Sequence, residues 1–230
     1  MAIAVDSALT TYTATGLSTS ITRAHTCTGS DNMLFAAFQT ATISTDNITD
    51  VTYDSVSFFS NLVGRAVNGA DVQSYIYWQA QGTGDATSHN VVATCSTPDV
   101  FRLYTASYTG VDQASPIDAT ALNETNTGGA NATESTTITV VAENCWAFML
   151  CTNNAAAPVP RTNAVELTTG TGGGFGCFHS NSTVATGSYT MGWSIPVGSN
   201  FAQATVLFSF KPATGGGGVV QPRFKGFSRP

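Results

Sequence analysis

The sequence predicts an all-β protein, a two-sheet jelly-roll-like β-sandwich followed by an extended C-terminal arm. Only 10% of its 230 residues are charged, and the residues that favour long helices on a protein surface are scarce. Thr, Val, Tyr and Phe, which suit a pleated strand, recur in short stretches separated by Gly, Asn, Asp and Ser. A chain of this length can bury a substantial hydrophobic core.

Three stretches in the first third of the chain carry the clearest strand signals. Met33–Phe38 is a compact apolar run that predicts a central strand. Val51–Phe59 alternates around a turn expected at Asp54-Ser55. Val72–Ala80 also alternates, so Tyr75 and Tyr77 should face one side of the sheet while Ile76 and Trp78 face the other.

The same pattern continues to the end of the folded body, and we find no internal repeat in it. Residues 121–135 form the longest polar stretch, which predicts an exposed loop or a loose edge strand. Further strands are expected at residues 89–95, 100–108, 136–141, 145–151, 164–168, 176–180, 188–193 and 204–211. More than ten short strands of this kind favour a jelly-roll type of sandwich.

The chain end differs in composition from everything before it. Four consecutive glycines, Gly215 to Gly218, indicate a hinge, which divides the chain into a β-sandwich domain (1–212), a Gly-rich linker (213–218) and an arm (219–230). The last eight residues carry three basic and no acidic side chains, whereas the first 222 carry five basic and fourteen acidic ones. The predicted partner-binding residues of the arm are Arg223, Phe224, Lys225, Phe227 and Arg229.

Composition also bears on location and partners. A net charge of −6 argues against general binding to nucleic acid, which requires a basic surface. We see neither an apolar run long enough to span a membrane nor a signal peptide, so we expect synthesis in a cytoplasm and no membrane partner.

Four segments together carry a resemblance to a known group of proteins. They are Leu34–Phe38, Val51–Val56, Tyr75–Trp78 and Ser107–Ile117, the last of which contains a Tyr-x-Gly-Val-Asp turn. In this order the chain resembles the β-sandwich modules of tailed-phage virion proteins and bacterial surface proteins, over roughly residues 30–210. The resemblance implies a jelly-roll fold with a structural or binding role, and it brings no catalytic residues.

Sites for chemistry are sparse in this sequence. The three histidines are His25, His89 and His179, and no Gly-x-Ser-x-Gly elbow or credible carboxylate pair accompanies them. The sharpest pattern is His25-Thr26-Cys27 with Cys177-Phe178-His179, which would form a Cys2His2 zinc set if the two strands were neighbours. Two buried thiols and two surface imidazoles are the stronger expectation, so we expect no enzyme, no metal and no cofactor.

Cysteines and aromatic residues leave two further alternatives open. Buried free thiols are the expectation for all five cysteines, with disulfides to one another or to a neighbouring subunit as the alternative. A group of aromatic side chains could line a sugar-binding face, although core packing is the stronger expectation. These side chains are Tyr75, Tyr77, Trp78, Trp146 and Trp193.

These observations favour a structural virion protein, a phage capsid decoration or cement subunit that binds neighbouring subunits or capsid proteins through its arm. Such a subunit would be a homo-oligomer, made in the host cytoplasm and located in the virion. The alternative is a receptor- or glycan-binding adhesin module, such as a tail-fibre or lectin-like domain. That alternative predicts exposed aromatic side chains at one loop end and a dispensable arm.

Overall fold

The computed structural model describes residues 1–8, 11–41, 46–68, 72–127, 133–170, 174–195 and 201–214. Within these ranges the chain forms β-strands and no α-helix, which confirms the predicted all-β class. The strands are β1 Ala4–Ala8, β2 Thr13–Thr26, β3 Asn32–Thr40, β4 Ile48–Tyr53, β5 Val56–Ser57, β6 Leu62–Asn68, β7 Val72–Gly82, β8 Ser88–Thr109, β9 Ile117–Thr127, β10 Thr133–Val140, β11 Trp146–Asn153, β12 Val159–Pro160, β13 Val165–Gly170, β14 Phe175–His179, β15 Gly187–Ser194 and β16 Phe201–Phe210.

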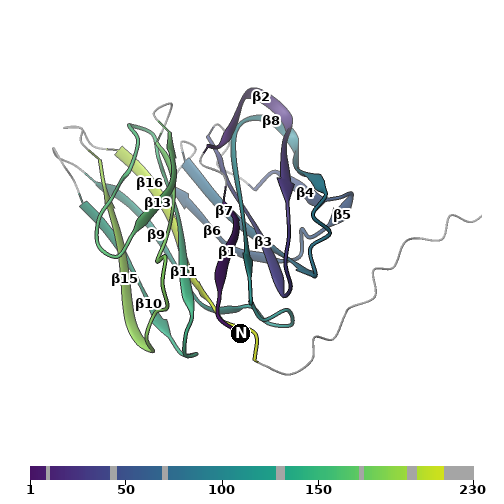
Figure 1. Cartoon of the computed structure of the whole chain (residues 1–230). Coiled ribbons are helices and arrows are strands. Elements are labelled where there is room, and N and C mark those ends of the chain that lie inside the picture. The colour runs from purple at the N-terminus through teal and green to yellow at the C-terminus, as the bar shows by residue number, and fades with distance from the viewer. Residues whose placement is uncertain are drawn as a thin grey trace, which may run out of the picture.

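The strands form three antiparallel sheets rather than the two that the sequence predicted. The largest has the order β5-β4-β8-β3-β7-β6 with β1 and β2 also paired to β8, and the others have the orders β13-β14-β11-β16-β9 and β10-β15-β12. The long strand β8 folds the largest sheet over, because its first part pairs with β4 and its last part with β3. Figure 1 therefore shows four layers, from β10 and β15 on one side to β4 and β5 on the other.

Three hydrophobic cores separate the four layers. The central core, between β3 and β11, includes Phe35, Tyr108, Phe148, Phe208 and Phe210. The first-half core lies on the other side of β3, and the second-half core lies on the other side of β11. Alternate residues of β3 and β11 face different cores, so both strands are buried along their whole length. This explains why both read as unbroken apolar runs in the sequence.

The two halves of the chain share one pairing order. In the first half β6, β7, β3, β8 and β2 lie side by side, and in the second half β13, β14, β11, β16 and β9 do the same. The outer layers match as well, with β4-β8-β2 corresponding to β12-β15-β10. A non-glycine residue with positive φ stands four residues before the central phenylalanine in each half, namely Asp31 before Phe35 and Asn144 before Phe148.

The layer that contains β3 packs face to face with the layer that contains β11. Their strand orders run in opposite directions, so that the edge strand β6 of one layer lies against the edge strand β9 of the other. At one edge β6 lies against β9, where the Glu124 carboxylate accepts a hydrogen bond from the Val67 amide at 2.7 Å. At the opposite edge the ring of Tyr12 lies 5.3 Å from that of Phe175 in β14. An approximate twofold relation between the halves, with β3 facing β11 at its centre, accounts for both contacts.

Several local predictions are confirmed and others need correction. The central strand at Met33–Phe38 is β3, and the turn at Asp54-Ser55 is present, with positive φ at both residues. The two strands expected at 89–95 and 100–108 are one bent strand, β8. The polar stretch from residue 121 is an edge strand as far as Thr127, because β9 pairs with β16 along ten residue pairs.

Candidate functional site

The predicted arm residues, Arg223, Phe224, Lys225, Phe227 and Arg229, lie outside the described residues, as do Gly215 to Gly218. The structure does describe the segment from which the arm departs, Lys211 to Thr214, which we call the arm root.

The arm root is fixed to the body by backbone hydrogen bonds. Pro212 forms a β-bridge with Val111, and the Ala213 amide donates to the Gly110 carbonyl at 2.8 Å. The N-terminal ammonium of Met1 donates to the Ala213 carbonyl at 2.8 Å, which places the start of the chain beside the arm root (Figure 1). Lys211 adds a side-chain hydrogen bond from Nζ to Ser115 Oγ at 2.8 Å. The point of departure of the arm is thus set by the fold.

The Tyr-x-Gly-Val-Asp turn, residues 108–112, provides most of these anchors. It lies between β8 and β9, where the first half of the chain leads into the second. Gly110 has a φ of +68°, and a Cβ at this position would lie 2.2 Å from the Ala2 carbonyl oxygen. Only glycine satisfies both conditions without displacing the N-terminal segment. Asp112 then closes the turn by accepting hydrogen bonds from the amides of Ala114 and Ser115.

Asp6 ties the N-terminal strand to the same end of the body. Its carboxylate accepts hydrogen bonds from the Thr28 amide and hydroxyl, from Asn32 Nδ2 at 2.7 Å and from Ser107 Oγ at 2.7 Å. Burial acts to raise the pKa of this carboxyl, but the hydrogen bonds from Thr28, Ser107 and Asn32 outweigh it and hold the pKa below its ordinary value. Asp6 is therefore a charged structural anchor.

The residues of the suggested zinc set are not brought together. Buried His25 lies in the first half, with Nδ1 3.0 Å from Thr105 Oγ1 and Nε2 2.9 Å from Ser107 Oγ. His179 lies in the second half, with Nδ1 3.3 Å from the Tyr108 hydroxyl. Both imidazoles are buried and not at the surface as expected, because these strand positions face the interior of the fold. Burial lowers the pKa of each to about 4. In the part of the chain that the structure describes, no group of three His, Cys, Asp or Glu side chains could hold a metal ion.

The cysteines are buried, as predicted, and all five are free thiols. Burial raises the pKa of the Cys27 thiol to about 11 and that of Cys145 to about 12. Such thiols remain protonated and make poor nucleophiles at neutral pH.

His89 is the histidine that reaches the surface, and it lies between two carboxylates. Its Nδ1 is 2.9 Å from Asp54 Oδ1 and its Nε2 is 2.9 Å from Asp85 Oδ2. The Tyr53 ring packs edge-on against the imidazole. Asp54 belongs to the β4–β5 turn and Asp85 to the β7–β8 loop, so the imidazole of His89 links these two loops.

A polar hollow lies on the second half of the chain, between the β12–β13 turn and the β14–β15 connection. Its volume is about 380 Å³, and Arg161, Asn163 and Tyr189 line it together with small hydroxyl side chains. Arg161 Nε donates to Ser194 Oγ at 2.7 Å, and Asn163 Nδ2 donates to the Thr190 carbonyl at 2.9 Å. The Tyr189 hydroxyl donates to the Asn163 carbonyl, so the guanidinium, the amide and the phenol that line this open hollow are all held by hydrogen bonds within the protein.

Sequence reasoning missed this hollow because its lining residues come from separate turns. The aromatic side chains that the sequence offered for a sugar-binding face lie elsewhere: Tyr75, Tyr77, Trp146 and Trp193 are core residues and Trp78 packs against the central core. Core packing was the stronger expectation and is confirmed for these residues.

No family model matches this chain, and no curated protein matches it. No helix in the described ranges combines the length and hydropathy needed to cross a membrane.

Proposed function

We propose that this protein is a structural virion subunit that decorates or cements a phage capsid and binds neighbouring subunits through its C-terminal arm. The observation that carries the proposal is the anchored arm root. The hydrogen bonds from Met1 and to Gly110 hold Ala213 in place, so the basic, aromatic chain end departs from a defined point of the body. The proposed role requires no catalytic residue and no cofactor, and it places the protein in the virion after synthesis in the host cytoplasm.

We further propose that each half of the body is a jelly-roll-like sandwich. The pairing order supports this, since the first strands of each half lie beside its last ones: β1 and β2 pair with β8, while β9 pairs with β16 and β10 with β15. Two such units packed through their inner sheets form a rigid block with the arm at its seam. Rigid blocks with extended arms suit a protein that functions through contact area rather than chemistry.

The mechanism under this proposal is avidity. Each arm contributes a weak contact, and tethering through Gly215–Gly218 raises its effective concentration at the neighbouring surface. A homo-oligomer or a symmetric capsid lattice multiplies these contacts. The arm can therefore hold an assembly that no single contact would hold.

The mass of the purified protein in solution tests the proposal, measured for the full-length chain and for a chain ending at Thr214, each with and without purified phage particles. We expect the full-length chain to form a defined oligomer or to load onto particles, and the shortened chain to do neither. A full-length R223A/K225A/R229A variant controls for effects of truncation on folding. Equal behaviour of all three proteins would refute a role for the arm.

The second candidate function is binding of a glycan or another polar receptor group, and the hollow beside Arg161 and Tyr189 favours it. A guanidinium, an amide and a phenol around about 380 Å³ are groups that bind sugar hydroxyls or carboxylates. Glycan-array binding that survives truncation at Thr214 and disappears in an Arg161→Ala variant would support this candidate over the first. Absence of binding by the intact chain would argue against it.

A further inference from the structure

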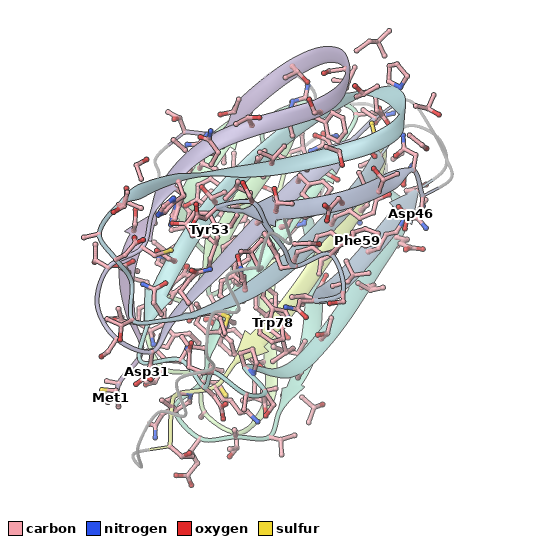
Figure 2. All side chains as sticks on the ribbon, turned by 90° about the vertical axis from the view of Figure 1, so that its right-hand side faces the viewer. Met1, Asp31, Asp46, Tyr53, Phe59 and Trp78 are labelled. Carbon is pink, nitrogen blue, oxygen red and sulfur yellow. The ribbon has the colours of Figure 1, made fainter. Side chains whose placement is uncertain are left out.

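One corner of the first half exposes apolar side chains within a short stretch of chain. Val56, Phe59 and Leu62 lie between β5 and the start of β6, with 52%, 37% and 42% of their surfaces exposed. The Phe59 ring stacks on Tyr77 at 5.8 Å with an interplanar angle of 21°, and Leu62 pairs with Tyr77 across β6 and β7. Phe59 and Leu62 therefore lie against a buried aromatic side chain, and Figure 2 shows Phe59 on that face. Together with Val56 we call them the apolar patch.

The same corner carries negative charge. Asp50 lies beside the patch, where its Oδ1 accepts a hydrogen bond from Ser57 Oγ at 2.5 Å. Asp54 lies in the turn that leads to Val56, and His89 joins it to Asp85. We call the three apolar residues and these three aspartates the acidic corner. The guanidinium of the neighbouring Arg65 donates hydrogen bonds to the Tyr75 hydroxyl and to Gln73 Oε1.

The arm has the complementary composition. Residues 222–230 contain three basic side chains, two phenylalanines and no acid. Sixteen residues, 215–230, follow the last described position, and a chain of that length can span about 53 Å when extended at roughly 3.3 Å per residue. The arm can therefore reach the surface of an adjacent molecule.

We propose that the acidic corner of one copy binds the arm of a second copy, with Phe224 and Phe227 on the apolar patch and the basic side chains beside the aspartates. This inference rests on the proposed assembly function and names the receiving surface. A neighbouring copy is the occupant because an arm folded onto its own corner would link nothing. The corresponding turn of the second half carries Arg161, which repels a basic segment, so it is not the receiving surface.

Two full-length variants test the proposal. The corner variant is D54N/D85N/L62S, in which asparagine still hydrogen-bonds to His89 and the exposed Leu62 loses its apolar contact. The arm variant is R223A/K225A/R229A. The matched control is V141T/E143Q, which removes an exposed apolar group and an exposed acid from the second half. Self-association is followed by sedimentation over a range of protein concentrations and ionic strengths.

We expect the corner and arm variants each to associate about ten-fold more weakly than the unmodified chain, since the corner variant removes two charges and one apolar contact and the arm variant removes three charges. The control should associate like the unmodified chain. An equimolar mixture of the two variants should form pairs that neither forms alone, because one supplies an intact arm and the other an intact corner. At an ionic strength of 1 M, where the Debye length is about 3 Å, the difference in association between the unmodified chain and the two variants should become smaller.

The other outcomes distinguish a failure of this inference from a failure of the proposed function. If the corner variant associates normally while the arm variant does not, the arm binds elsewhere; the inference fails and the proposed function stands. If neither variant changes the association, both fail. If both variants weaken association but their mixture forms no pairs, the corner receives the arm of its own chain and the inference is overturned. A Val56→Thr variant, which keeps the side-chain shape, repeats the test should L62S alter folding.

Discussion

Replacement of Phe35 by alanine tests whether the two halves fold as one unit. Phe35 is fully buried at the centre of the central core, and its ring lies 5.0 Å from Phe208, 5.1 Å from Phe210, 5.8 Å from Tyr108 and 6.0 Å from Phe148. Three of these four partners belong to the other half of the chain. The substitution therefore opens a cavity in the contact between the halves.

The magnitude follows from burial and ring contacts. Truncating a fully buried phenylalanine costs about 3–5 kcal/mol of unfolding free energy. Against a typical total of roughly 5–15 kcal/mol this is a large fraction. At about 2–4 °C of melting temperature per kcal/mol for a chain of this size, the melting point should fall by about 6–20 °C.

Urea denaturation and calorimetry measure the loss, and amide hydrogen exchange shows where it falls. We expect exchange to accelerate in β4 and also in β15, the outer layer of the other half. Leu17→Ala, at a side chain 71% exposed, should change stability by less than about 0.5 kcal/mol. A loss below about 1 kcal/mol, or unchanged exchange in β15, would refute the view that one core joins the halves.

Three further predictions follow from the anchors of the body. Gly110→Ala should lower stability by at least about 1 kcal/mol and loosen the N-terminal segment, because φ is +68° and the new Cβ would meet the Ala2 carbonyl; unchanged proteolysis near Met1 would contradict this. Unfolded histidine binds a proton near pH 6.5, whereas buried His25 and His179 do so only near pH 4. The free energy of unfolding should therefore fall as the pH drops from about 6.5 to 4. A His25→Gln variant should show a smaller fall when unfolding is measured by urea titration at each pH. Asp6→Asn should destabilise the protein at neutral pH and progressively less as the pH falls below the ordinary value of 3.8 toward the lowered pKa of Asp6, because this carboxyl stabilises the fold only while it is ionised. An equal loss at pH 3 and pH 7 would show that its charge does not contribute.

Local chemistry let the sequence by itself determine several features of this protein. The shortage of helix formers and the alternation of Tyr75 and Tyr77 with Ile76 and Trp78 established the all-β class and which residues share a face. The apolar run at Met33–Phe38 indicated a central strand, which is β3. These features depend on neighbours along the chain, and the sequence contains those neighbours.

Only the tertiary structure decided how many sheets form and which residues meet. The common pairing order of the two halves has no counterpart in a visible sequence repeat, because a strand order is satisfied by any residues that alternate correctly and fill the core. Phe35 faces Phe148 across the central core, although neither residue signals its partner in the sequence.

The candidate sites show the same limit. Arg161 and Tyr189 approach each other, and Asp54 and Asp85 share His89, through turns that are far apart along the chain. The sequence pointed to the basic, aromatic arm by composition alone. The anchored root and the acidic corner come from long-range packing, which the folded backbone creates by bringing distant turns to one surface.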